Sequence, residues 1–133
     1  MHSMLFVNMP VANVGRSREF FSDLGYAINE QLSGENAVTL VLGDNQFAML
    51  LQHEAFDSLH PVETANAAKV KECVVCLGVD SRGAVDALVN RAIAAGGTDG
   101  DSEDHGSMYG RSYNDLDGHS WQIFWTDDAL THN

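Results

Sequence analysis

The last strand expected in the chain carries one polar side chain among large apolar ones. Along Ser120–Thr126 the alternation puts Gln122 and Phe124 on one face, and the other face carries Trp121, Ile123 and Trp125. The preceding Asp117-Gly118 pair is typical of a tight two-residue hairpin turn, because glycine accepts a positive φ. We therefore predict a closing hairpin with both faces covered, in which Gln122 projects into a core or a cavity.

The first half of the chain predicts one helix and four strands. Asn13 is a good N-cap for a helix over Val14–Leu24, and Gly25 supplies a left-handed stop. Apolar stretches separated by turn formers predict strands at Met4–Val11, Tyr26–Leu32, Ala37–Leu42 and Phe47–His53. The order of elements is βαβββ.

The periodic pattern fails between the two halves. From Glu54 to Lys71, small and polar residues replace large apolar ones. We expect a long connection there with one helical turn.

The second half predicts the same order of elements. Ser81 can cap a helix that runs to about Ala95, with apolar positions at Val85, Leu88, Val89, Ala92 and Ile93. Strands are expected at Glu72–Val79, His105–Tyr109, Arg111–Leu116 and Ser120–Thr126, and the acidic stretch Asp99–Asp104 is expected to be a turn.

These halves look like an internal duplication. Val11 and Val79, at the ends of two strands, are 68 residues apart, and Leu42–Phe47 aligns with Leu116–Trp121 at the closing hairpins. We predict one α+β domain over residues 1–133, with a first module at about 1–54, a linker at about 55–71 and a second module at about 72–128. Two βαβββ modules would form a curved mixed sheet with helices on the convex side and a cleft on the concave side.

Charge narrows the possible partners. The net charge of -12 repels phosphate backbones and anionic lipid surfaces, so nucleic acid and membranes are not expected as partners. An acidic surface also favours a cationic ligand, although a solvated acidic surface explains the charge as well. No run of about 18 apolar residues and no signal-peptide pattern is present, so we expect a cytoplasmic protein.

Cys73 and Cys76 form a C-x-x-C spacing without a second pair. In the expected strand these two side chains point to opposite faces, which excludes a simple disulfide. We expect both to be buried, reduced and structural.

Several motifs resemble a known family. Val11-Ala12-Asn13, Arg16-Ser17, Phe20-Phe21 and Leu24-Gly25 follow one another in the first half, and Arg111, Asp115 and Asp117-Gly118-His119 mark the closing hairpin. With the duplication, they resemble the vicinal oxygen chelate superfamily, the glyoxalase, bleomycin-resistance and ring-cleaving dioxygenase group. The resemblance implies the fold and not the reaction, because this scaffold serves isomerases, dioxygenases, thiol transferases and metal-free binding proteins.

The resemblance also implies where metal-dependent members hold a divalent ion: by His, Gln or Glu on the first and last strands of each module. Here these positions fall on Phe6 with Asn8 two residues on, Ala48 or Leu50, Val74 and Gln122. Neutral amides alone hold such ions weakly, so no cofactor is expected. The alternative is Ni, Zn, Mn or Fe at a non-standard site that recruits His53, Glu54 or His105.

Two functions stay open. The first is binding of a small, partly apolar molecule, with cations among the candidates, in a cleft lined by Phe6, Asn8, Leu50, His53, Arg111, Gln122 and Phe124. The second is a glyoxalase-like or dioxygenase-like enzyme that uses a divalent metal at the non-standard site. Arg111 either recognises an anion or pairs with Asp115 or Asp117. The resemblance also implies a homodimer.

Overall fold

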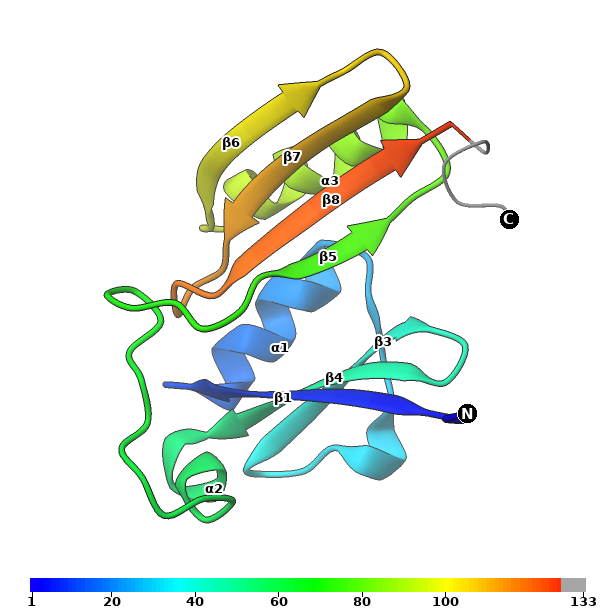
Figure 1. Ribbon diagram of the computed structural model, residues 1–133. Helices are drawn as coiled ribbons and strands as arrows, with labels where there is room; N and C mark the ends of the chain where they lie inside the picture. The colour runs from blue at the N-terminus through cyan, green and yellow to red at the C-terminus, as the bar shows by residue number, and fades with distance from the viewer. Residues whose placement is uncertain (128–133) are drawn as a thin grey trace. The chain divides into compact units, whose positions relative to one another are not determined.

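The computed structural model describes residues 1–127, which form two compact units: unit 1, Met1–Thr64, and unit 2, which begins at Ala65 (Figure 1). Each unit contains one four-stranded mixed sheet with a helix against one face. This arrangement confirms the α+β class and the two βαβββ modules. Within the described residues, no helix is long and apolar enough to cross a membrane.

Unit 1 contains four strands in the order β1-β4-β3-β2, with β1 parallel to β4 and the other pairs antiparallel. Its elements are β1 (Leu5–Val11), α1 (Val14–Asp23), β2 (Ala27–Ile28), a 3₁₀ helix (Glu30–Leu32), β3 (Ala37–Gly43), β4 (Gln46–Gln52) and α2 (His53–Asp57). A helical turn was expected within the connection, and the short α2 lies at its start.

Helix α1 confirms the local signals that predicted it. The Asn13 side chain accepts a hydrogen bond from the backbone N–H of Arg16 at 3.0 Å, and Gly25 ends the helix with φ of 103°. Phe20 and Phe21 of this helix are buried, and their rings meet edge to face with 4.9 Å between the ring centres. Full burial of such a side chain contributes about 1.5–3 kcal/mol.

The prediction of a strand over Tyr26–Leu32 is wrong for most of these residues. Only Ala27–Ile28 pair with β3, and a 3₁₀ helix follows. The Asn29 side chain accepts from the backbone N–H of Leu32, and the hydroxyl of Thr39 donates to the Leu32 carbonyl at 2.6 Å. These side-chain bonds satisfy backbone groups that a strand would have paired with its neighbour.

Unit 2 repeats this topology with strand order β5-β8-β7-β6 and a parallel β5–β8 pair. Its elements are β5 (Val75–Gly78), α3 (Arg82–Ala94), β6 (Thr98–Asp104), β7 (Met108–Asn114) and β8 (Ser120–Thr126). Ser81 caps α3 as expected, by accepting from the backbone N–H of Ala84 at 3.0 Å. The helix buries Val85, Val89 and Ala92, and the sheet buries Tyr113, Trp121 and Ile123.

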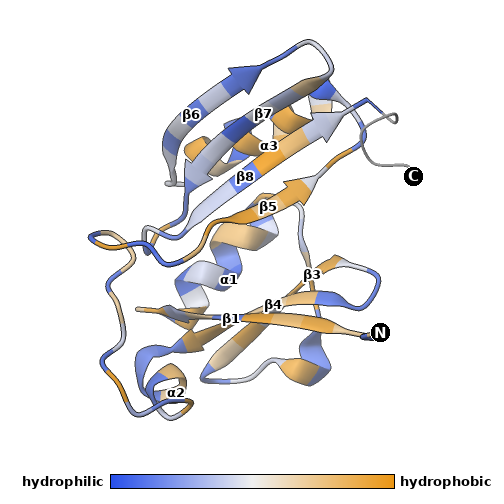
Figure 2. Cartoon of the chain, in the orientation of Figure 1, coloured by the Kyte–Doolittle hydropathy of each residue, from blue (hydrophilic) through white to orange (hydrophobic). Residues whose placement is uncertain are grey.

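The prediction of a turn over Asp99–Asp104 is wrong, because this acidic stretch belongs to strand β6. The strand expected over His105–Tyr109 is absent at its start, because β7 begins at Met108. β6 is an edge strand whose seven residues are all exposed, so its acidic side chains stay in water. Figure 2 shows β6 as hydrophilic along most of its length. Gly106, with φ of 80°, turns the chain into β7, and Arg82 donates to the Gly106 carbonyl and to the carboxylate of Asp104.

Both cysteines were expected to be buried, and both are exposed free thiols. Strand β5 starts at Val75, so Cys73 lies before it. Cys76 lies on the face of the sheet opposite α3, because its neighbours Val75 and Leu77 pair with the buried Trp121 and Ile123. The expectation failed because β5 is shorter than its apolar run and has only one covered face in this unit.

A closing hairpin joins β7 to β8 as expected, but its turn runs from residue 115 to 119 and is organised by Asp115. The buried Asp115 carboxylate accepts from the backbone N–H groups of Asp117 and His119 and from the indole N–H of Trp121. Burial raises the pKa of this carboxyl, against the opposing effects of His119 and these three donors. Gly118 has φ of 87°, and a Cβ there would lie 2.8 Å from Cα of Ala68.

Candidate functional site

The candidate site lies on the sheet face of unit 2 that points away from α3, which is called the open face here. Alternation along β8 puts Gln122, Phe124 and Thr126 on it, and their partners on β7 are Ser112, Gly110 and Met108. On the other side of β8, Cys76 of β5 pairs with Gln122. Trp121 and Ile123 are fully buried on the other face. This confirms the expectation that Gln122 and Phe124 lie on the opposite face of β8 from these two residues.

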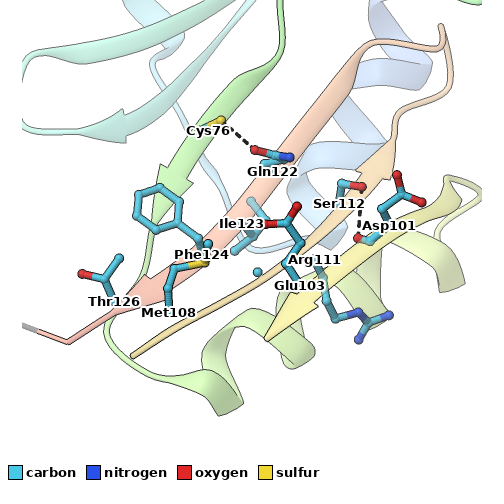
Figure 3. Close-up of a pocket in the computed structure, with 11 residues that line it drawn as sticks. Cys76, Asp101, Glu103, Met108, Arg111, Ser112, Gln122, Ile123, Phe124 and Thr126 are labelled. Carbon is cyan, nitrogen blue, oxygen red and sulfur yellow. Dashed lines mark hydrogen bonds between the residues drawn. The ribbon is translucent and has the colours of Figure 1, made fainter. Parts of the chain in front are cut away.

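A hollow of about 360 Å³ lies on this open face (Figure 3). Its size is within the usual range for sites that hold small molecules. It is lined by residues from all four strands of unit 2: Cys76, Asp101, Glu103, Met108, Gly110, Arg111, Ser112, Gln122, Ile123, Phe124 and Thr126.

Two glycines shape the hollow by giving room to Phe124. A Cβ at Gly78 would lie 3.4 Å from the ring of Phe124, so the ring leans over β5. On the other side, a Cβ at Gly110 would lie 3.5 Å from Phe124 Cβ and 3.9 Å from the sulfur of Met108. The missing side chain of Gly110 therefore leaves space beside two apolar groups.

Gln122 is held by a neighbouring strand. The thiol of Cys76 donates a hydrogen bond of 3.0 Å to the side-chain oxygen of Gln122. Because the two residues are direct partners across the parallel β5–β8 pair, the backbone register sets this contact. The contact fixes which end of the amide faces β5.

The β6 side of the hollow is acidic. Asp101 and Glu103 line it from the edge strand, and the side chain of Arg111 does not neutralise them. The guanidinium of Arg111 instead bonds Asp86 at 3.1 Å and Asn90 at 3.0 Å, both on α3. Arg111 therefore lines the hollow from β7, but its guanidinium pairs with α3 on the opposite face of the sheet.

Arg111 has a structural pairing, but not with Asp115 or Asp117, the partners expected. Tyr109 also donates to Asp86, at 2.6 Å, and this bond together with Arg111 holds the pKa of Asp86 below its usual value. Burial alone would lower the pKa of Arg111, yet Asp86 and Asp99 raise it. Since Asp86 lies on α3, these bonds tie β7 to the helix.

A second cation holds the other end of β6. Arg82 makes two hydrogen bonds to Asp104, and the pKa of Asp104 lies far below its usual value because of them. Its guanidinium also lies 5.1 Å from the ring centre of Tyr109 and 5.3 Å from that of Trp125. The edge strand that carries Asp101 and Glu103 is thus anchored to α3.

The residues expected to line a cleft lie in both units. Gln122, Phe124 and Arg111 line the hollow of unit 2. In unit 1, Phe6 and Asn8 share one face of β1, and Phe6 stacks on Phe47 at 4.9 Å. Leu50 is fully buried, in register with Met9 and Val38, on the opposite face, and His53 is exposed at the start of α2.

The register corrects the alignment of the two halves. Asn45 and Gly118, the positive-φ residues of the two closing turns, are 73 positions apart, and the aligned hairpins had been offset by 74. Gln122 therefore corresponds to Met49, not Ala48. Met49 pairs with Asn8 as Gln122 pairs with Cys76. The equivalent pairs are Asn8–Met49 in unit 1 and Cys76–Gln122 in unit 2, and Val74 lies outside β5.

The donors beside Gln122 are poor ones for a hard divalent metal, and the carboxylates that line the hollow, Asp101 and Glu103, lie two strands away on β6. The side-chain oxygen of Gln122 already accepts a hydrogen bond from the Cys76 thiol. The thioether of Met108 and a neutral amide are weak ligands for a hard ion. Among the described residues, no group of three or more His, Cys, Asp or Glu side chains lies close enough to hold an ion. His105, named for the non-standard site, lies 3.5 Å from Glu103, and His53 and Glu54 begin α2 in the other unit.

Sequence reasoning missed most of the hollow. Cys76, Asp101, Glu103, Met108, Gly110, Ser112 and Thr126 were not among the candidates. Thr126 could have been found by continuing the alternation from Gln122 and Phe124. The acidic pair could not, because no apolar alternation marks β6 as a strand.

Known proteins similar to this chain share its fold. The family model described as bleomycin resistance protein-like N-terminal matches residues 3–43. A structure of a hypothetical protein from S. aureus is 26% identical, with a TM-score of 0.75 over 94% of each chain. No protein with curated annotation matches.

Two further structures are similar at lower identity and support the fold alone. A glyoxalase-related enzyme from Fulvimarina pelagi has a TM-score of 0.80 at 15% identity, over 95% of this chain and 89% of that one. A glyoxalase/bleomycin resistance protein/dioxygenase family enzyme from Burkholderia phytofirmans PsJN has a TM-score of 0.73 at 19% identity, over 91% and 96%. The chain therefore shares the paired βαβββ fold of these structures, and its residues 3–43 are similar to the bleomycin resistance protein-like N-terminal family.

Proposed function

We propose that this protein binds a small, partly apolar molecule, preferably a cation, in the hollow of unit 2, and that it does so without the usual metal of the superfamily that it resembles. The observation that carries the proposal is the hollow itself, which encloses about 360 Å³ between an apolar wall and an acidic edge. Ligand sites of soluble proteins combine such an apolar surface with a few polar groups that fix orientation.

The wall offers contact to an apolar group of the ligand. The ring of Phe124 and the thioether of Met108 flank the space above Gly110. An aromatic ring or a branched alkyl group placed there would replace water against both side chains. Sulfur–aromatic contact adds to that gain.

Charge favours a cation at the other end. Asp101 and Glu103 line the hollow from β6, and the guanidinium of Arg111, which also lines it, bonds residues of α3. The net charge of -12 adds a field of the same sign over the whole protein. A cationic ligand is therefore attracted, and an anionic one is repelled.

The description of the matched family model supports the binding proposal. The matched family model is described as bleomycin resistance protein-like, and other neighbours are named glyoxalase-related. Phe6 and Asn8, which share a face of β1, remain proposed as ligand-facing residues of unit 1. Leu50 is left out because it is fully buried.

A binding footprint tests the proposal. Benzyltrimethylammonium and its neutral isostere neopentylbenzene are titrated into the isotope-labelled protein while backbone amide shifts are followed by NMR. We expect the largest shifts at Gly110, Gln122 and Phe124, and larger ones for the cation. Largest shifts outside β5, β6, β7 and β8, or no shifts, would overturn the hollow as the site. Bleomycin is a second compound to titrate, and because it is larger than the hollow only part of it could enter.

We also propose a homodimer, which the family resemblance implies. Light scattering on the eluted protein measures its mass, and the chain mass is 14.4 kDa. A particle of twice that mass supports the dimer. A monomer at all concentrations overturns it.

A further inference from the structure

The side-chain hydrogens that line the hollow are almost all used inside the protein. The Ser112 hydroxyl donates to the carbonyl of Asp101 at 3.3 Å, and the Thr126 hydroxyl donates to the carbonyl of Asp127 at 3.0 Å. The Cys76 thiol donates to Gln122. The guanidinium of Arg111 bonds Asp86 and Asn90 of α3, so among the described lining residues this leaves the side-chain amide nitrogen of Gln122 as the donor available to a ligand.

Cys76 decides where that nitrogen points. An amide has one accepting end and one donating end, and the thiol takes the accepting oxygen on the β5 side. The nitrogen therefore lies on the other side of the amide. Figure 3 shows it directed away from Cys76, toward Ser112 and β7.

The opposite edge of the hollow presents acceptors. Asp101 and Glu103 lie on β6, two strands away from Gln122 in the order β8-β7-β6. Neighbouring strands are about 4.8 Å apart, and a hydrogen bond at each end takes about 3 Å. A ligand that meets both edges therefore carries its acceptor and its cation only a few ångströms apart.

We propose that Gln122 is the specificity-determining residue of the hollow and that Cys76 is its positioning residue. Together they select ligands that present a hydrogen-bond acceptor, such as a carbonyl oxygen, to β8 and a cationic group to β6. A ligand with a donor at the first position would meet the N–H groups of Gln122 and lose affinity. This inference rests on the proposed function, since it names the chemistry of the molecule bound in the same hollow.

A matched pair of probes tests this selection. Phenacyltrimethylammonium carries a carbonyl beside its cation, and phenethyltrimethylammonium has the same ring and cation without it. Calorimetry on the full chain should give roughly 2- to 10-fold tighter binding of the carbonyl probe, the range expected for one net hydrogen bond. Gln122→Met, of similar length but without a donor, should bring the ratio close to one while the second probe binds as before.

Variants of Cys76 test the positioning role. Cys76→Ser keeps a donor toward the Gln122 oxygen and should keep the preference for the carbonyl probe. Cys76→Ala removes it, lets the amide rotate, and should reduce the preference. A full preference in Cys76→Ala would overturn the role of Cys76.

The outcomes separate this inference from the proposed function. Equal binding of both probes to the unmodified protein, or a preference unchanged in Gln122→Met, overturns the selection by Gln122 and leaves ligand binding in the hollow standing. Failure of both probes to bind overturns the selection and the proposed function together. An unfolded variant would be recognised from its amide spectrum, and Gln122→Glu, which replaces the donor by an acceptor and should reverse the preference, then takes its place.

Discussion

Cys76 and Gln122 are direct partners across the parallel β5–β8 pair, and the thiol donates to the amide oxygen at 3.0 Å. The equivalent pair in unit 1 is Asn8 with Met49, which offers an amide and a thioether. The two units therefore present different chemistry at the same place in the same topology. In unit 2 this pair belongs to the same sheet as the acidic edge strand β6.

The exposure of both thiols can be measured directly. Cys73 and Cys76 are exposed and free, so both should react with Ellman's reagent in the folded protein. Cys76 should react more slowly, because its hydrogen is donated to Gln122. The single variants Cys73→Ser and Cys76→Ser assign each rate. Thiols that react only after denaturant is added would contradict the exposed placement.

Asp115 is predicted to stabilise the closing turn of unit 2. Asp115→Ala leaves the indole N–H of Trp121 and two backbone N–H groups without their acceptor. The expected loss is about 2–3 kcal/mol in the free energy of unfolding, measured by urea titration with tryptophan fluorescence. Asp44→Ala, in the exposed closing turn of unit 1, is the control and should change it by less than about 0.5 kcal/mol. Equal effects of the two substitutions would refute the role of Asp115.

Local signals predicted the helices well and the strands less well. Asn13 and Ser81 cap α1 and α3 as expected, because a cap involves residues only three apart in the chain. The acidic β6 was missed, since an edge strand in water needs no apolar alternation. The one-residue error in the repeat arose from matching Leu42 with Leu116, whereas the positive-φ residues Asn45 and Gly118 give the true alignment.

The candidate site was predictable only in part, for the same physical reason. Alternation along one strand placed Gln122 and Phe124 on a common face. The partners of that face come from strands distant in sequence, and Cys76 is 46 residues from Gln122. Register between strands depends on packing of the whole unit, which no local pattern contains.

The network around Asp86 predicts a loss of stability in acid. Its pKa is lowered from 3.8 by the Tyr109 hydroxyl and by Arg111, so the native state favours the ionised form. That contribution is present above the unfolded pKa of 3.8 and is lost as pH falls through the lowered pKa of the folded state. Asp86→Asn should therefore flatten the pH dependence of the melting temperature in this range.

Two controls accompany the acid measurement. Asp80→Asn changes an exposed carboxylate before α3 and should leave the pH dependence as it is. Added salt should weaken the effect, because Asp86 is half exposed. The raised pKa of Asp115 changes stability with pH in the opposite sense. Because Asp115 is present both in Asp86→Asn and in the unmodified protein, its effect cancels in the comparison. An identical acid response of Asp86→Asn and the unmodified protein would refute the role of this network.

Metal binding separates the proposed function from the enzyme alternative. We expect Ni, Zn, Mn and Fe to bind the dialysed protein below one equivalent at micromolar concentration, because the donors on the open face do not form an ion site. Elemental analysis after dialysis measures the amount bound. One equivalent that is lost in His53→Ala or His105→Ala would instead support a metal-dependent enzyme at the non-standard site.

The most direct test of the proposed function fills the hollow. Gly110 has no positive φ, and a leucine there would occupy the space beside Phe124 and Met108. Gly34→Leu is the matched control, because a side chain at Gly34 would meet nothing within 4 Å. Glu103→Gln removes a charge from the acidic edge without filling the hollow, and it serves if Gly110→Leu does not fold.

Calorimetry with benzyltrimethylammonium then gives the result that decides the account. We predict that Gly110→Leu weakens binding by roughly tenfold or more, equal to about 1.4 kcal/mol, that Glu103→Gln weakens it to a smaller degree, and that Gly34→Leu binds as the unmodified protein does. Unchanged affinity in a folded Gly110→Leu protein would contradict the central claim that this hollow is the ligand site.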